Sequence, residues 1–101
     1  MDMARSLNGT TEVIKLKGRF DILAINKFGN ETSKHLDDQS TQKLELDLGE
    51  VTYMDSSAVG ALFVLHDKVK RVGKTISLTS AHGIVRRTLD NMCIGILIPV
   101  L

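Results

Sequence analysis

The chain has few of the residues that characterise disulfide-stabilised or membrane-spanning proteins. Its 101 residues include one cysteine, Cys93, one proline, Pro99, and no tryptophan. A single cysteine cannot form an internal disulfide, which is typical of proteins that work in a reducing compartment. The sequence also lacks an apolar run of bilayer-spanning length and an apolar N-terminal segment like that of a signal peptide. We therefore expect a cytoplasmic protein that does not insert into membranes.

An excess of charge of either sign is absent as well. Thirteen Lys and Arg residues balance twelve Asp and Glu residues, which leaves a net charge of +1. This balance provides no electrostatic basis for binding nucleic acid or a membrane surface. The one basic cluster, formed by Lys68, Lys70, Arg71 and Lys74, falls at the end of a predicted helix. Because cations suit the negative end of a helix dipole, we expect this cluster to be a solvated face.

Signatures of catalysis and metal binding are missing. The chain contains no Gly-x-Ser-x-Gly nucleophile elbow and no Gly-x-Gly-x-x-Gly or Walker-type phosphate loop. Its histidines, His35, His66 and His82, show no ligand-like spacing with other metal donors. The sequence therefore predicts a protein that is not an enzyme and that uses neither a cofactor nor a metal.

Hydrophobic residues make up 43% of the chain, enough for the core of one compact domain. Their spacing predicts strands at Glu12–Lys17, Leu44–Leu48, Thr75–Thr79 and Ile96–Val100, and helices at Leu23–Leu36, Ser57–Arg71 and Gly83–Asn91. The last helix is expected to direct Val85, Leu89 and Met92 inward, and Gly73 to end the helix before it. Residues 1–11 carry no pattern and are expected to be flexible.

The alternation of strands and helices predicts a single α/β domain with a mixed sheet. Strand-to-helix crossovers join parallel strands in a right-handed sense. The helix at Ser57–Arg71 is the most apolar and should lie centrally on the sheet. Its N-terminus would then lie at the carboxyl edge of the strands, where α/β proteins usually place functional groups.

That N-terminus carries the most informative motif of the chain, Asp55-Ser56-Ser57. Asp and Ser are favoured helix caps, because their side-chain oxygens accept hydrogen bonds from the free amides of the first turn. The same amides and the helix dipole favour a phosphate at this position. Ser56 is therefore either a simple capping serine or a phosphorylation site.

Residues 46–57, from Leu46 to Ser57, resemble the signature of the STAS family of bacterial anti-sigma-factor antagonists, which typically ends in Asp-Ser-(Ser/Thr)-Gly-Leu-Gly. The upstream Gly18-Arg19-Phe20-Asp21 is similar to a second family landmark, a glycine turn that ends in Asp. Gly60 matches the last glycine of the signature, whereas Ala58 and Val59 replace the preceding Gly and Leu.

The resemblance runs from about Glu12 to the C-terminus and implies a four- to five-stranded mixed sheet with helices mainly on one face. We expect the domain to span residues 1–101. The resemblance also implies phosphorylation of Ser56 by a serine kinase of the histidine-kinase-like ATPase type and reversal by a metal-dependent serine phosphatase. Asp21, Asp55, Ser57 and Gly60 would support the site or contact the partner. The unmodified protein would bind its kinase and release a downstream regulator, either a sigma factor or a target such as biofilm and exopolysaccharide control.

Two alternatives remain open at this point. The chain could be a non-switching STAS subunit of a transporter or other assembly, with Ser56 only a cap, or a small-ligand or nucleotide binder. The apolar ending, residues 96–101, could expose an edge, so we expect a monomer or weak dimer. Pro99 would discourage strand addition there.

Overall fold

The computed structural model describes residues 1–101 as a four-stranded sheet with helices. The strands are β1 (Asp2–Asn8), β2 (Thr11–Phe20), β3 (Lys43–Met54) and β4 (Thr75–Thr79), in the spatial order β1-β2-β3-β4. The α-helices are α1 (Ile25–Ser33), α2 (Ser56–Arg71) and α3 (Gly83–Asn91), and the short 3-10 helices are η1 (Ile22–Ala24) and η2 (Ile94–Ile96). β1 is antiparallel to β2, whereas β2, β3 and β4 are parallel, so the sheet is mixed as predicted.

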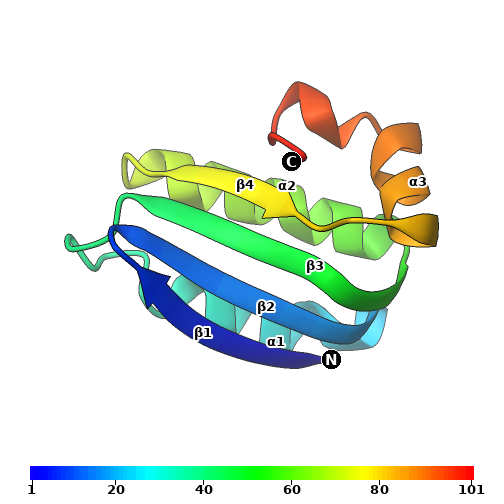
Figure 1. Ribbon diagram of the computed structural model, residues 1–101, viewed down its shortest axis with the longest axis horizontal. Helices are drawn as coiled ribbons and strands as arrows, with labels where there is room; N and C mark the ends of the chain where they lie inside the picture. Colours follow the sequence, from blue (N-terminus) through cyan, green and yellow to red (C-terminus); the bar gives the residue numbers. More distant parts are fainter.

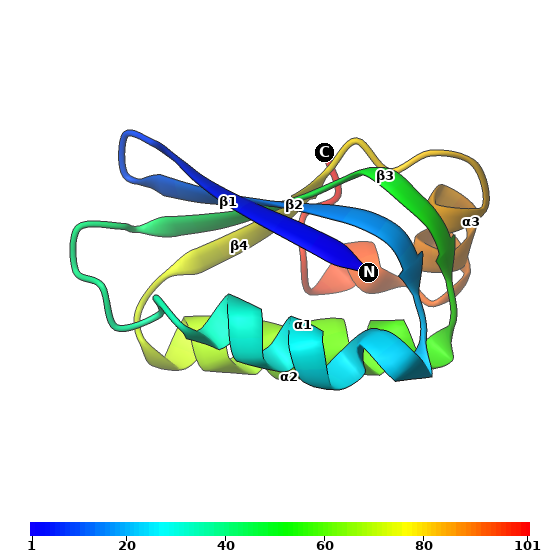
Figure 2. The same ribbon diagram turned by 90° about the horizontal axis from the view of Figure 1, so that it is seen from below.

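The two long helices cover one face of the sheet. Figures 1 and 2 show α1 and α2 side by side behind the strands, with α3 at the end of the sheet and the C-terminal segment beside β4. The other face carries alternating polar residues such as Lys15, Glu45 and Asp47. The fold class predicted from the sequence is therefore confirmed.

The N-terminal segment forms an edge strand, which corrects the expectation that residues 1–11 are flexible. β1 pairs along its whole length with β2, from Asp2 opposite Lys17 to Asn8 opposite Thr11. The connection contains Gly9 with φ +62°. The two-residue loop is Gly9-Thr10, and glycine is favoured at the first position of such a loop because it tolerates positive φ. Most β1 side chains are exposed, so the strand lacks the hydrophobic alternation on which the sequence prediction depended.

The two central strands are longer than their patterns predict, because both are irregular. Their pairing shifts register between Lys15 and Lys17 and again between Gly18 and Arg19. Gly18 has φ +101°, which a residue with a side chain rarely adopts. Such bulges break the two-residue alternation and re-aim the strand. β3 therefore extends to Met54, well beyond the predicted end at Leu48.

The helices lie where they were predicted, with small differences at their ends. α2 and α3 match the expected ranges to within one residue. α1 ends at Ser33 rather than Leu36, although Leu36 is still buried. Gly73, with φ +76°, follows α2 as expected, and its N–H donates to the carbonyl oxygen of Lys70.

The hydrophobic core lies between the sheet and the helix pair. It comprises 22 buried residues from all the secondary-structure elements except β1, including Phe20 and Phe28, whose ring centroids lie 4.6 Å apart. Leu62 of α2 is fully buried against this core. Burial of one leucine side chain contributes about 2 kcal/mol, so this packing is what holds the start of α2 at the sheet edge.

The C-terminal segment differs most from the sequence prediction. Residues 96–100 do not form a strand; η2 is followed by a single parallel bridge between Val100 and Leu78 of β4. Pro99 lacks an N–H, so only its carbonyl oxygen takes part, accepting from the Leu78 amide at 2.9 Å. Met92, expected to face inward, is 44% exposed because the chain leaves α3 there.

One member of the basic cluster is not solvated. The Lys74 ammonium is buried and donates to the carbonyl oxygen of Asp38 at 2.7 Å and to the Thr41 hydroxyl at 2.8 Å. Lys68, Lys70 and Arg71 are exposed, as predicted. The sequence placed Lys74 between this helix and the next strand, but its pattern did not reveal that the ammonium is buried against Asp38 and Thr41.

Candidate functional site

Two aspartates lie at one edge of the sheet because two parallel strands end there in register. Phe20 of β2 pairs with Met54 of β3, and the next residue in each strand is Asp21 or Asp55. Each carboxylate caps the helix that follows. Asp21 accepts from the Leu23 amide at 3.1 Å, and Asp55 accepts from the amides of Ser57 and Ala58 at 3.0 and 3.2 Å. The capping role predicted for Asp55 is confirmed, and Asp21 has the same role.

The Asp55 carboxylate is held in its charged form. The Ser57 hydroxyl donates to it at 2.5 Å and, with the two amide bonds and the nearby charge of Arg19, lowers the pKa of Asp55 below its usual 3.8. Partial desolvation acts in the opposite direction but does not prevail. The start of α2 therefore carries a fixed negative charge at neutral pH.

The two serines of the motif occupy different environments. Ser57 is half-buried, and its hydroxyl is committed to Asp55. Ser56 is exposed, and its hydroxyl makes no hydrogen bond within the protein. Ser57 is therefore the residue that supports the cap, while the Ser56 oxygen is accessible to another molecule.

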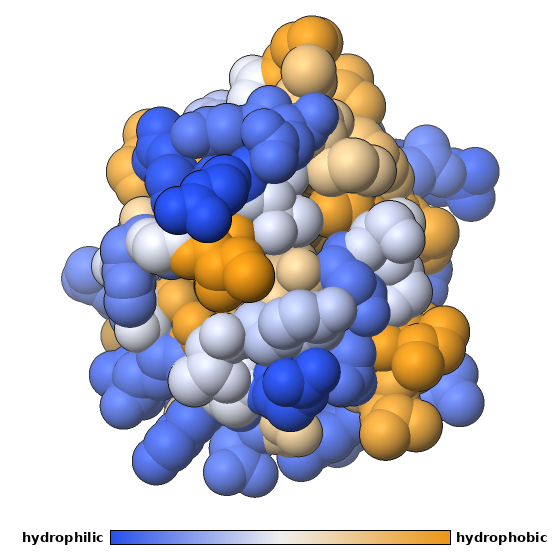
Figure 3. Space-filling model, turned by 90° about the vertical axis from the view of Figure 1, so that its right-hand side faces the viewer, coloured by the Kyte–Doolittle hydropathy of each residue, from blue (hydrophilic) through white to orange (hydrophobic).

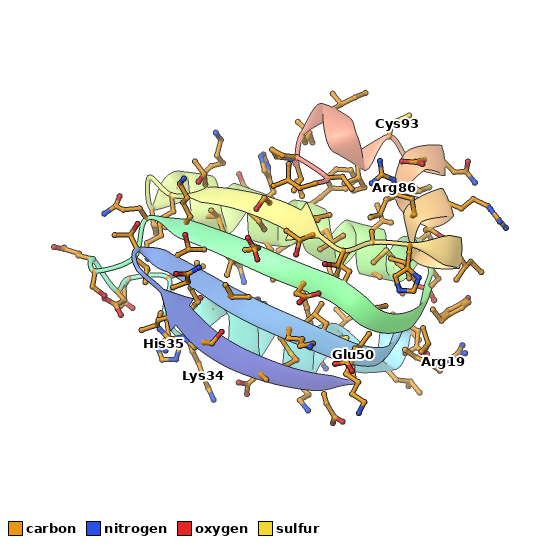
Figure 4. The ribbon with its side chains drawn as sticks, viewed as in Figure 1. Arg19, Lys34, His35, Glu50, Arg86 and Cys93 are labelled. Atoms are coloured by element: carbon orange, nitrogen blue, oxygen red, sulfur yellow. The ribbon has the colours of Figure 1, made fainter.

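Arg19 is a residue of this edge that the sequence analysis did not single out. Its guanidinium lies 4.1 Å from the centroid of the Tyr53 ring, and Nε lies 3.3 Å from an Asp21 carboxylate oxygen. Figure 4 shows Arg19 projecting from the end of the sheet. Stacking on Tyr53 restrains a side chain that would otherwise be mobile. Sequence spacing could not indicate this pair, because Arg19 and Tyr53 meet only through the β2–β3 register.

Gly60 lies one turn beyond Ser56 on the exposed side of α2. It borders a groove between the two helices, which we call the α1–α2 groove. Its walls include Ile22, Ile25 and Gly29 on one side and Gly60, Ala61 and Val64 on the other. The groove holds about 370 Å³ and has Ser57 at one end and Lys68 at the other.

Apolar side chains are exposed around this end of the molecule. Leu23 of η1 is 90% exposed, and Ile22, Ile84 and Ile96 are also exposed. Figure 3 looks onto this end and shows apolar patches separated by hydrophilic surface. The patches from η1, α3 and η2 therefore do not form one continuous band.

No group of three or more His, Cys, Asp and Glu residues is arranged to hold a metal ion. None of the helices has both the length and the apolar character that crossing a bilayer requires. The site consists of a helix N-terminus, two capping carboxylates, a free hydroxyl and a bordering groove.

Comparison with known proteins identifies relatives of the whole chain. A family model described as "Mlab, STAS domain" matches residues 3–99. A STAS-domain containing protein of Pseudomonas aeruginosa (strain UCBPP-PA14) is 32% identical over 84 residues, which cover 83% of this chain and 81% of the relative.

Solved structures share the fold at low identity. The anti-sigma factor antagonist SpoIIAA of Bacillus, in its unphosphorylated form, is 19% identical, with a TM-score of 0.81 over 99% of this chain and 88% of its own. Its phosphorylated form is 18% identical, with a TM-score of 0.72 over 99% of this chain and 91% of its own. Part of the murine anion transporter Slc26a9 is 17% identical, with a TM-score of 0.75 over 85% of this chain and 14% of the transporter.

Proposed function

The chain belongs to the STAS domain family, and we propose that it is a partner-switching regulator controlled by reversible phosphorylation of Ser56. One observation carries the proposal: of the two hydroxyls at the start of α2, only that of Ser56 is exposed and without a hydrogen bond. The fold shared with anti-sigma factor antagonists supports a regulatory role. SpoIIAA has been solved in both an unphosphorylated and a phosphorylated form, which supports this mode of control.

Phosphorylation of Ser56 would change the surface without changing the fold. A phosphate adds about −1.5 to −2 charges. The dipole of α2 favours negative charge at its N-terminus, and the Ser56 side chain already points into solvent. No packed group must move to make room. The effect would therefore fall on whatever protein covers this edge.

A partner on this edge would meet a second negative charge beside Asp55. The Asp55 carboxylate is already ionised, so the two charges would reinforce each other. Covering both would remove them from water, which costs several kcal/mol when no cation compensates. The unphosphorylated form is then the binding form. Asp21 lies at the same edge, and Gly60 permits close approach one turn along α2.

The partners we propose are a serine kinase of the histidine-kinase-like ATPase type and a metal-dependent serine phosphatase. The kinase would bind the edge formed by Asp21, Asp55 and Ser56 and would release a downstream regulator. The chain itself contributes the acceptor hydroxyl and the binding surface, and needs no catalytic group of its own.

Phosphate transfer to defined variants tests the proposal. The protein, its cognate kinase and ATP are combined, and the modified residue is located by fragment-ion mass spectrometry. We expect one phosphate on Ser56, none on Ser56→Ala, and an undiminished stoichiometry on the matched control Ser57→Ala. Transfer to Ser57, or no transfer while the kinase modifies a control substrate, would contradict the proposal.

The second candidate function is a non-switching subunit of a larger assembly, favoured by the fold shared with part of an anion transporter. In that case Ser56 is only a surface residue at a helix start. A stable complex purified from the native cell, with unchanged affinity for the Ser56→Asp variant, would support this function and exclude the switch.

A further inference from the structure

We propose that the α1–α2 groove binds a single-chain amphiphile with an anionic head group, of the fatty carboxylate class. The groove is lined mostly by apolar side chains and leads into a second, polar depression on the same side of α1. Lys68 belongs to both, so the apolar and polar parts form one continuous surface. This inference does not depend on phosphorylation of Ser56.

Two glycines keep the groove open. Gly29 of α1 and Gly60 of α2 have ordinary helical backbones, and a Cβ added at either would meet no atom within 4 Å. Glycine inside a helix costs about 1 kcal/mol relative to alanine. The folded monomer does not need glycine at either position, because no neighbouring group would clash with a larger side chain. The free space above the two glycines points to a molecule that occupies it.

The polar end of the groove is cationic. The Lys68 ammonium donates to the Ser33 hydroxyl at 3.3 Å and has no carboxylate partner among the ion pairs of the protein. The exposed Lys34 lies beside it and pairs only with the half-buried Glu31, at 3.2 Å. No acidic residue lines either part of the groove. An anionic head group is therefore favoured at this end.

The opposite end of the groove is lined by no cationic side chain, which sets the direction of the ligand. Ser57 lines that end, and its hydroxyl is bonded to the ionised Asp55. Figure 4 shows Lys34 toward one end of the molecule and Arg19, from the capped edge, at the other. A carboxylate would be attracted by Lys68 and Lys34, so the alkyl chain would extend from Lys68 toward Ser57.

The dimensions match one alkyl chain. From Ser57 to Lys68 the helix rises about 16 Å, at 1.5 Å per residue. The volume of about 370 Å³ accommodates roughly twelve groups of the size of a water molecule. A helix of the same length, with its diameter of about 10–12 Å, would need roughly three to five times that volume. The space therefore fits a narrow chain better than a partner helix.

Titration of the purified protein with sodium dodecanoate, below its micelle concentration, tests the proposal. Amide chemical shifts should change at Gly29, Gly60 and Ala61, with saturation at one ligand per chain. Each methylene removed should weaken binding by up to about fourfold, because the chain is transferred from water to an apolar surface. Dodecyltrimethylammonium, with the same tail and a cationic head, should bind at least about tenfold more weakly.

Two variants distinguish binding in the groove from adsorption elsewhere on the protein surface. Gly29→Leu should fill the groove and abolish the shift changes, and its unchanged or higher melting temperature will show that it folds. Lys68→Glu should weaken dodecanoate binding about tenfold and favour the cationic analogue. Lys70→Glu, on the same helix but outside the groove, is the charge-matched control and should bind as the wild type does.

Three results would overturn the proposal. They are shift changes confined to the exposed C-terminal segment around Ile96 and Leu97, equal binding by Gly29→Leu, and equal affinity for the anionic and cationic probes. Occupation of the groove by an acidic amphipathic peptide, with no response to dodecanoate, would identify a protein-docking surface instead. Binding that persists in Ser56→Asp would leave the inference intact even if the phosphorylation switch failed.

Discussion

At the residue scale, adjacent polar side chains at the start of α2 have different roles. The Asp55 carboxylate accepts hydrogen bonds from the Ser57 hydroxyl and from the amides of Ser57 and Ala58, whereas the Ser56 hydroxyl between them is free. This division follows from the helix geometry, because an N-cap side chain reaches the amides two and three residues ahead. The hydroxyl of the first helical residue is left pointing outward.

Removal of the Asp55 cap should destabilise the protein and change its response to acid. We expect Asp55→Ala to lower the free energy of unfolding at pH 7 by about 1 kcal/mol. Because the folded-state pKa of Asp55 is lowered, its stabilisation is present above the ordinary value of 3.8 and is lost as pH falls through the folded pKa. Urea unfolding between pH 7 and pH 3 should show the wild type and variant converging. A constant difference over this range would contradict the assignment.

At the element scale, α2 is the element on which both proposals depend. It begins at the capped edge, lines the groove and is followed by Gly73, which has φ +76°. Its buried residues, among them Leu62, Leu65 and Val69, lie at helical spacing and attach one side of the helix to the sheet. The opposite side, with Gly60 and Val64, remains exposed and borders the groove.

Two glycine-to-alanine changes in and after α2 should have opposite effects on stability. Gly60→Ala should stabilise the fold by up to about 1 kcal/mol, because the added Cβ meets no atom and alanine favours the helix. Gly73→Ala should destabilise it by about 1 kcal/mol, because a side chain is strained at positive φ. Thermal unfolding of the two variants and of the wild type measures the sign of each stability change. Destabilisation by Gly60→Ala would show that this glycine has a structural role within the monomer.

At the scale of the whole molecule, contacts distant in sequence hold the ends of the sheet together. The buried Lys74 ammonium connects the start of β4 to the loop at residues 37–42, through Asp38 and Thr41. β1 similarly becomes a strand only by pairing with β2, and a partly buried ion pair between Arg5 and Glu12 joins the two. Such links have no local sequence pattern.

Loss of the Lys74 link should loosen one loop and weaken the fold. We expect Lys74→Met to lower the free energy of unfolding by roughly 1–3 kcal/mol, since the carbonyl and hydroxyl groups that it satisfies would lose a charged donor. Amide hydrogen exchange should accelerate at residues 38–42. The exposed Lys70, changed to Met, is the matched control and should be neutral. Equal exchange in both variants would show that the loop does not depend on Lys74.

The sequence by itself determined the elements whose apolar residues recur at a regular spacing. β4, α2 and α3, the caps at Asp21 and Asp55, and the end of α2 at Gly73 were predictable, because neighbouring residues decide each of them. The family also followed from these landmarks. The assignment of the phosphorylation site to Ser56 stays a prediction.

Only the tertiary structure decided the rest. β1 and the bridge at Val100 depend on pairing with a neighbouring strand, and the extension of β3 depends on register shifts opposite Gly18. The Arg19–Tyr53 stack and the α1–α2 groove join residues more than thirty positions apart. Such features have a common physical reason: their stability comes from contacts formed when the chain closes on itself, which leave no periodic pattern in the sequence.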